Sequence, residues 1–195
     1  MVGKRVPGSP LTLTLSPKGR GALLRLLPRT SMRKRILGID PGLNITGYGV
    51  IDVGPSGVSI VEAGVVRGKS RGDVPARVRE IYEGITDVIT SLKPTVMAME
   101  ELYSHYERPK TAIIMGHARG VLCLAAAQND LTFHSYAATQ IKKILTGSGR
   151  APKSQMQDSI RRELGLSAVP EPADVADALA VALCHHYLSK IATTI

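Results

Sequence analysis

Aromatic residues are scarce in this 195-residue chain, which has one phenylalanine, six tyrosines and no tryptophan. The core must therefore consist mostly of valine, isoleucine, leucine and alanine, as in α/β proteins with buried strands. No apolar run approaches the roughly 18 residues of a membrane span, so we expect no membrane association. The two cysteines, Cys123 and Cys184, lie in apolar stretches without metal-ligand spacing, which predicts buried thiols of a cytoplasmic protein.

Acidic residues are absent from the first 33 positions, which carry seven of the chain's basic residues. The other 162 residues hold 18 basic and 16 acidic side chains, so little of the net charge of +9 belongs to them. Within that part, the segment 142–162 has six basic residues and one acid, Asp158. It predicts a surface that contacts phosphate groups, although a solvated helix face would have the same composition. Its basic residues are Lys142, Lys143, Arg150, Lys153, Arg161 and Arg162.

Residues 1–31 differ in composition from the rest, with alternating threonine and leucine followed by glycine, proline and arginine. They could form a basic arm that touches DNA or a targeting segment, but Arg25 interrupts the apolar stretch and no cleavage pattern is clear. We favour an extension that is disordered or lies upstream of the true start at Met32, because a recognisable domain begins directly afterwards. This interpretation assigns residues 32–190 to one domain and 191–195 to a short tail.

Hydrophobic periodicity and turn residues predict the order β-β-β-α-β-α-β-α-α-α. Three hairpin strands followed by alternating helices and strands predict an α/β fold, with a mixed five-stranded sheet flanked by helices. The expected strands span 35–40, 45–52, 58–67, 95–100 and 131–136, and the expected helices span 75–92, 109–129, 138–145, 153–164 and 171–190, with Pro172 in the first turn of the last.

Four carboxylates stand at positions that suit a metal site. Asp40 and Glu100 each end a very apolar strand, and neighbouring strands would bring them together, although each acid could simply mark where a strand meets solvent. Asp174 and Asp177 are three residues apart and share one helix face. Stabilisation of the helix N-terminus would explain Asp174 equally well, but it explains Asp177 less well.

Carboxylate oxygens are the ligands that Mg²⁺ prefers. Two such ions can activate a water molecule and stabilise the leaving oxygen in phosphodiester hydrolysis. No set of His and Cys suggests zinc, since the adjacent His185 and His186 point in different directions on a helix. The four carboxylates alone indicate a possible metal site. Together with the predicted order of elements and the basic segment that contains Lys142 and Lys153, they indicate a metal-ion phosphodiesterase.

Several blocks of the sequence resemble the RuvC-type Holliday junction resolvases. They are GIDPGLNITGYGVID, MAMEELY, GHARGV, YAATQIKK with APKSQMQ, and ADVADALAVA. The resemblance runs from about Arg35 to Tyr187, in the same order and with similar spacing. It implies a ribonuclease H-like fold and paired, symmetric cuts in four-way DNA junctions during recombination and DNA repair. It also implies cytoplasmic action with the RuvA and RuvB branch-migration proteins.

The resemblance also assigns roles to residues. It implies that Asp40, Glu100, Asp174 and Asp177 bind Mg²⁺, two ions per site, with Mn²⁺ as a substitute. Lys142 and Lys153 match the family's functional lysines, which places them beside the scissile phosphate. The charge of the basic segment, and not the resemblance, makes Lys143 and Arg150 further candidates for DNA contacts. Tyr103 matches a position where relatives can carry phenylalanine and could stack on a base, although it could also be an ordinary loop aromatic.

The helix expected over Pro109–Asn129, with Gly116, Arg119 and Gly120, matches the family's dimer element. Small residues four apart permit close contact between helices, which agrees with a homodimer; packing against the chain's own sheet is the alternative. A two-fold axis would place two sites on opposed strands of a junction.

Three other classes of protein share parts of this pattern. Phosphotransferases of the actin and sugar-kinase type begin with a similar glycine-rich hairpin. They also need a second domain, for which this chain has no room, and a second phosphate loop, for which it has no candidate. A ribosomal-RNA-processing nuclease of the same superfamily fits less well, given paired Asp174 and Asp177 and the sequence YSHYERPKTA. An inactive relative should have lost at least one of the four carboxylates, and none is missing.

Overall fold

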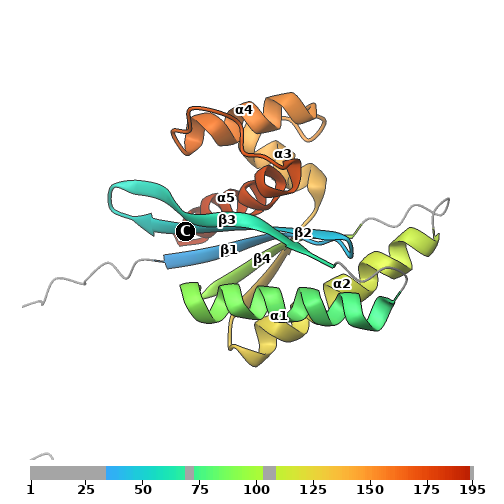
Figure 1. Cartoon of the computed structure of the whole chain (residues 1–195). Helices are drawn as coiled ribbons and strands as arrows, with labels where there is room; N and C mark the ends of the chain where they lie inside the picture. Colours follow the sequence, from blue (N-terminus) through green and yellow to red (C-terminus); the bar gives the residue numbers. More distant parts are fainter. Residues whose placement is uncertain (1–33, 69–72, 103–108, 194–195) are drawn as a thin grey trace, which may run out of the picture. The chain divides into compact units, whose positions relative to one another are not determined.

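The computed structural model describes residues 34–68, 73–102 and 109–193 (Figure 1). The strands are β1 (Lys34–Asp40), β2 (Ile45–Gly54), β3 (Gly57–Arg67), β4 (Val96–Glu100) and β5 (Thr132–Tyr136). The helices are α1 (Val74–Leu92), α2 (Pro109–Gln128), α3 (Ala138–Thr146), α4 (Lys153–Glu163) and α5 (Ala173–Thr193). The predicted order of elements is confirmed. Residues 1–33 and Tyr103 lie outside the described residues, so the interpretation of the N-terminal segment stays a prediction.

The five strands form one mixed sheet in the order β3-β2-β1-β4-β5. β1, β2 and β3 pair antiparallel, whereas β4 runs parallel to β1 and β5 runs parallel to β4. Helices α3, α4 and α5 cover one face of this sheet, and α1 and α2 cover the other (Figure 1). The predicted α/β class and the ribonuclease H-like arrangement are confirmed.

The core is divided between the two faces of the sheet. Side chains alternate along β1, so Ile36 packs in the cluster that includes α5, and Leu37 and Ile39 pack in the cluster that includes α1 and α2. The same alternation turns Asp40 toward the α5 face. Most of these buried side chains are aliphatic, as the shortage of aromatics predicts. None of the helices among the described residues has the length and apolar character that a membrane crossing requires.

The backbone of helix α5 approaches the backbones of β1 and β2 directly at two glycines. A Cβ atom added to Gly38 would lie 2.2 Å from the carbonyl oxygen of Ala178, and one added to Gly47 would lie 2.1 Å from that of Asp174. Glycine in a strand often marks such a close backbone approach. These two positions therefore determine how near the first turns of α5 come to the end of β1.

Three sequence-based expectations differ from the structure. Helix α5 begins at Ala173 instead of Glu171, because the residue before a proline favours extended backbone, and the Pro172 carbonyl accepts the helix's hydrogen bond from Val175. It continues to Thr193, so most of the supposed tail 191–195 is helical. Cys184 is buried, and burial raises the pKa of its thiol to about 12, but Cys123 is only half-buried.

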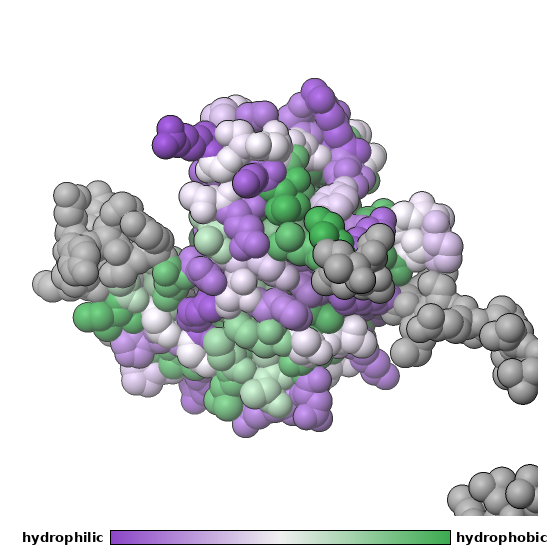
Figure 2. Space-filling model, turned by 180° about the vertical axis from the view of Figure 1, so that it is seen from behind, coloured by the Kyte–Doolittle hydropathy of each residue, from purple (hydrophilic) through white to green (hydrophobic). Residues whose placement is uncertain are grey.

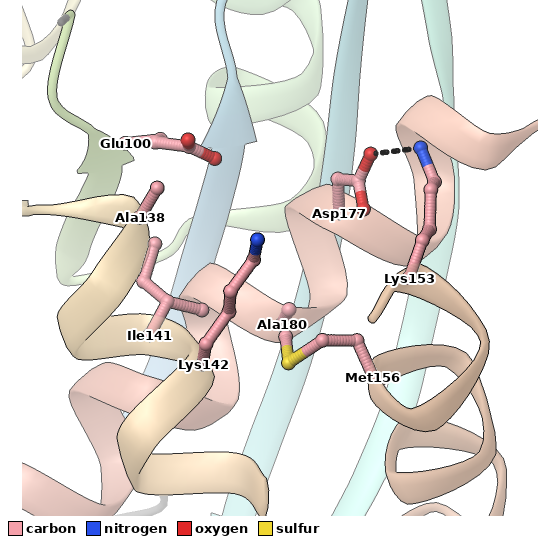
Figure 3. Close-up of a pocket in the computed structure, with 8 residues that line it drawn as sticks. All are labelled: Glu100, Ala138, Ile141, Lys142, Lys153, Met156, Asp177 and Ala180. Atoms are coloured by element: carbon pink, nitrogen blue, oxygen red, sulfur yellow. Dashed lines mark hydrogen bonds and ion pairs between the residues drawn. The ribbon is translucent and has the colours of Figure 1, made fainter. Parts of the chain in front are cut away.

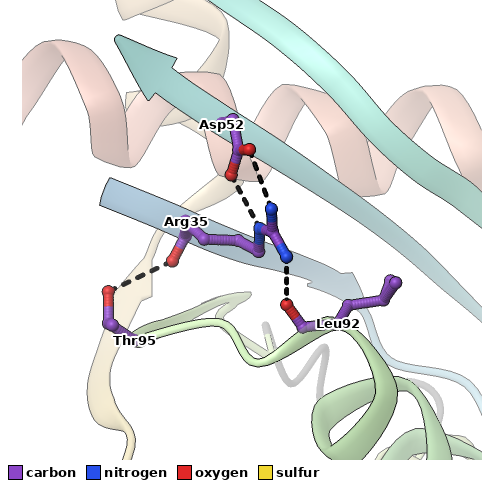
Figure 4. A network of polar contacts seen from close by, with 4 residues as sticks. All are labelled: Arg35, Asp52, Leu92 and Thr95. Atoms are coloured by element: carbon purple, nitrogen blue, oxygen red, sulfur yellow. Dashed lines mark hydrogen bonds and ion pairs between the residues drawn. The ribbon is translucent and has the colours of Figure 1, made fainter. Parts of the chain in front are cut away.

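A polar clamp holds the starting ends of β1 and β4 together (Figure 4). The Arg35 guanidinium donates two hydrogen bonds to the Asp52 carboxylate, at 2.7 and 2.8 Å, and a third to the Leu92 carbonyl at the end of α1. The backbone N–H of Thr95 donates to the Arg35 carbonyl at 3.0 Å. Because β4 follows directly, these contacts help to set its parallel register against β1.

Candidate active site

The first two carboxylates are brought together by strand register. β1 and β4 pair in parallel from Ile36 with Val96 to Ile39 with Met99, so Asp40 and Glu100 come next on adjacent strands. Both have the parity that turns a side chain toward α5, and both are half-buried. The predicted meeting of these two strand ends is confirmed.

The other two carboxylates come from the first turns of α5. Asp40 pairs with Gly47 across the antiparallel β1–β2 ladder, and the backbone of Asp174 lies directly over Gly47. Asp177 follows almost one turn later, and both side chains are half-buried. The glycine-mediated contact between α5 and the sheet is therefore what brings this helix pair to the strand ends.

The charges of the four acids interact. Burial is the largest influence on Asp40 and, together with the negative charges of Glu100, Asp177 and Asp174, raises its pKa to about 7. Ionised carboxylates in such a cluster repel one another, and a divalent cation would remove that repulsion. Within residues 34–68, 73–102 and 109–193, no three His, Cys, Asp or Glu side chains converge tightly enough to enclose an ion. The hard oxygen donors and their shared charge fit a Mg²⁺-type ion.

Two lysines oppose this negative charge. Burial and the charge of Asp177 raise the pKa of Glu100, while Lys142 and Lys153 act in the opposite direction. The pKa of Lys153 is itself raised, first by its hydrogen bond to Asp177. The cations are therefore electrostatically part of the same site as the acids.

A cavity between α3, α4, α5 and the end of β4 collects four of the predicted residues (Figure 3). The Lys153 ammonium donates to the Asp177 carboxylate at 2.9 Å. The Lys142 ammonium points into the space between Glu100 and Asp177 (Figure 3). The lining residues are Glu100, Ala138, Ile141, Lys142, Lys153, Met156, Asp177 and Ala180. A cavity with both acids and cations on its wall can bind a phosphate group.

The remaining predicted residues lie at different distances from this cavity. Asp40 and Asp174 do not line it, although their negative charges contribute to the raised pKa of Lys153 on its wall. Lys143 and Arg150 are exposed on the same side of the sheet, beyond the lining. The DNA-contacting role of Tyr103 stays a prediction, because this residue lies outside the described part of the chain.

Two contributors to the site were not assigned to it from the sequence: Gly47, and Arg119, which the sequence placed only in the expected dimer helix. Gly47 sets the distance between α5 and the sheet. Its alternation with Gly49 in one strand could have indicated this close backbone approach. Arg119 donates to the backbone carbonyl of Glu100 at 2.6 Å. No feature of the sequence indicated that contact, because the two residues meet only when α2 folds across the sheet.

The outer face of α2 is apolar and exposed. Ile113 is 62% exposed and Leu124 is 48% exposed. A Cβ atom added to Gly116 or Gly120 would meet nothing within 4 Å, so these glycines do not pack against the chain's own sheet. Figure 2 views the molecule from behind and shows apolar, green surface in its lower half, where α1 and α2 lie. Ile113, Gly116, Gly120 and Leu124 form an exposed apolar stripe on α2, and a second helix could pack closely against it.

Comparison with known proteins identifies relatives along most of the chain. Residues 36–185 match the family described as crossover junction endodeoxyribonuclease RuvC. A protein of that name from Rhodopirellula baltica is 53% identical over 155 residues, which cover 80% of this chain and 87% of the relative. The RuvC structure from Thermus thermophilus is 31% identical, with a TM-score of 0.75 over 82% of this chain and 97% of its own.

A second Thermus thermophilus structure, of RuvC in complex with Holliday junction substrate, is 30% identical with a TM-score of 0.77 and the same coverage. The matched residues include the four acids, which lie on β1, β4 and α5, and the two lysines, which lie on α3 and α4. This chain belongs to the crossover junction endodeoxyribonuclease RuvC family.

Proposed function

We propose that this chain resolves four-way DNA junctions in recombination and repair, by hydrolysing one phosphodiester bond in each of two opposed strands. The observation that carries the proposal is the cavity in which Lys142 and Lys153 face carboxylates from a strand end and from α5. Membership of the RuvC family, and the junction complex of the Thermus thermophilus relative, support a branched DNA as the substrate.

The proposed metal site consists of Asp40, Glu100, Asp174 and Asp177. Its oxygen donors suit Mg²⁺, two ions per site, and Mn²⁺ has similar ligand preferences. When bound, the metal would supply an activated water and stabilisation of the leaving oxygen. The raised pKa of Asp40 supports this assignment, because a cluster of repelling carboxylates gains most from a cation.

The lysines act on the substrate in this proposal. Lys142 and Lys153 would bind non-bridging oxygens of the scissile phosphate and stabilise the negative charge that develops on them. Lys153 is held in reach by Asp177, and Lys142 already points into the cavity. Lys143 and Arg150 would bind phosphates further along the strand, and we propose Tyr103 as the residue that stacks on a base.

We propose a homodimer that forms through α2. Its exposed apolar stripe and the open space over Gly116 and Gly120 support a close contact between two copies of this helix. Related by a two-fold axis, two sites would face opposed strands of one junction. By family resemblance we further propose cytoplasmic action with the RuvA and RuvB branch-migration proteins.

The test uses the purified full chain, Mg²⁺ and a synthetic four-way junction. We expect paired nicks in opposed strands and little cutting of a linear duplex with the same sequences. Asp40→Asn should bind the junction but cut it at least about 100-fold more slowly, because it removes a metal-binding charge. Asp130→Asn, an exposed acid far from the cavity, is the matched control. An intact junction, or unimpaired cutting by Asp40→Asn, would contradict the proposal.

A further inference from the structure

The end of β4 is anchored from the side of the sheet opposite to the acidic site. We propose that Arg119 is a positioning residue, which fixes the backbone at Glu100 and thereby sets the affinity of the carboxylate cluster for divalent cations. This inference rests on the proposed function, because it assigns Glu100 to the metal site.

The contacts of Arg119 converge on the ends of two strands. One guanidinium nitrogen donates to the carbonyl oxygen of Glu100 at 2.6 Å, and another donates to the hydroxyl oxygen of Ser135 on β5, also at 2.6 Å. The guanidinium carbon lies 5.9 Å from the centre of the Phe133 ring. Hydrogen bonds from a charged donor are roughly twice as strong as neutral ones, so this group fixes β4 and β5 firmly.

Glu100 needs such an anchor because β4 is short and ends there. The strand has five residues, and the parallel pairing with β1 stops at Met99. Beyond Glu100, the N–H of Glu101 donates to the Tyr136 carbonyl at 2.9 Å, which holds the chain on the β5 side. A bond to the Glu100 carbonyl fixes the peptide plane from which the carboxylate projects.

Arg119 must act through the backbone. Ser135 and Phe133 alternate with residues of β5 that face α5, so the guanidinium lies on the α2 face while the Glu100 carboxylate has the opposite parity. Arg119 is therefore separated from the proposed phosphate-binding cavity by the sheet itself. It also differs from Gly116 and Gly120, which are exposed on the outer face of the same helix.

Metal binding to the full-length protein, measured without DNA, tests this role. The readout is the loss of the solution electron paramagnetic resonance signal of Mn²⁺ on binding. Arg119→Met keeps the aliphatic stem but removes the donors, and we expect it to weaken Mn²⁺ binding about 10-fold, as loss of a supporting contact typically does. Arg119→Lys should restore part of this affinity, because an ammonium can donate to the Glu100 carbonyl.

Two further variants separate positioning from general stability. Ser135→Ala removes one partner of Arg119 and leaves the charge, so a smaller loss of Mn²⁺ affinity is expected even if Arg119→Met fails to fold. Arg79→Met removes an exposed arginine of α1 whose ion pair with Glu83 spans 4.0 Å, and it should bind Mn²⁺ normally.

The two proposals fail in different ways. Wild-type Mn²⁺ affinity in folded Arg119→Met, or in Ser135→Ala if the former does not fold, would overturn the positioning role whatever the protein cleaves. A wild-type protein that binds Mn²⁺ and leaves junctions intact would overturn the proposed function, while an affinity loss in Arg119→Met would still support the role of this residue.

Discussion

The two ends of the β1–β4 pair differ in how their charged side chains are arranged: opposite charges are paired at one end, and like charges are clustered at the other. At the starting end, Arg35 forms a two-pronged ion pair with Asp52 and also caps a carbonyl of α1. At the finishing end, Asp40 and Glu100 lie side by side, and burial with the charges of neighbouring acids raises the pKa of both. One end therefore stabilises the fold, and the other, whose acids resist ionisation, costs stability in the absence of a cation.

The difference indicates how a small domain keeps mutually repelling carboxylates close together. The strands that present the acids are fixed at the other end by the clamp, and α5 is fixed by backbone contact over Gly38 and Gly47. The acids can then remain close although they disfavour one another. The three variants below test whether the two ends are in fact so different, in order of decreasing expected effect on stability.

Gly47→Ala should have the largest effect. The new methyl group would lie 2.1 Å from the Asp174 carbonyl, so α5 must shift away from the sheet. We expect a loss of about 3 kcal/mol in the free energy of unfolding, measured with denaturant, together with slower junction cleavage. Gly54→Ala, in the same strand, meets nothing within 4 Å and should change neither quantity. Equal behaviour of the two variants would refute the contact argument.

Arg35→Gln tests the clamp. It leaves the Asp52 carboxylate without its two-pronged partner, and we expect a loss of about 2 kcal/mol in the free energy of unfolding. Cleavage by the protein that remains folded should be nearly unchanged, since the clamp lies at the far end of the strands. The exposed pair of Arg79 and Glu83 provides a control, because Arg79→Gln should have almost no effect on stability. A comparable loss in both would show that the clamp is no stronger than a surface ion pair.

Asp40→Asn should stabilise the metal-free protein by a smaller amount, about 1 kcal/mol after allowance for solvent screening. The folded state holds a proton on Asp40 up to a pKa of about 7, whereas an unfolded chain releases it near 4. Stability therefore falls as pH rises from about 4 to 7, and the gain from asparagine should be full above pH 7 and absent near pH 4.

The measurement for Asp40→Asn is denaturant unfolding in a chelator at pH 8 and pH 4. Saturating Mg²⁺ at pH 8 should stabilise the wild type and reduce its deficit relative to the variant. A constant difference across pH would mean that ionisation of Asp40 is not the source of the instability.

Residues whose position depends on local pattern are predicted correctly from the sequence. Apolar strands that end in Asp40 and Glu100 predicted their own juxtaposition, because parallel neighbours finish at the same edge of a sheet. Contacts that depend on tertiary packing are not predictable in this way. The contact of Arg119 with Glu100 joins a helix to a strand end 19 residues away, and the bond between Lys153 and Asp177 joins two helices. Neither hydrophobic period nor turn chemistry contains that information.

The start of α5 illustrates a third case. Pro172 suggested a helix that starts at Glu171 and has this proline in its first turn, but the helix begins two residues later, at Ala173, and the Pro172 carbonyl accepts the hydrogen bond from Val175. Such an error moves a boundary without moving Asp174 or Asp177 relative to each other, because both lie inside the helix in either assignment. Spacing within an element is therefore predicted more securely than the limits of the element.

The register of β1 against β4 has a consequence for how sequences of this kind can vary in length. Asp40 stands four positions after Ile36, and Glu100 stands four positions after Val96, the partner of Ile36. One residue inserted or deleted in either strand would turn its terminal acid to the opposite face, among the buried side chains beneath α1 and α2. Natural insertions and deletions should therefore collect in turns such as that between β2 and β3, while both strands keep a constant residue count.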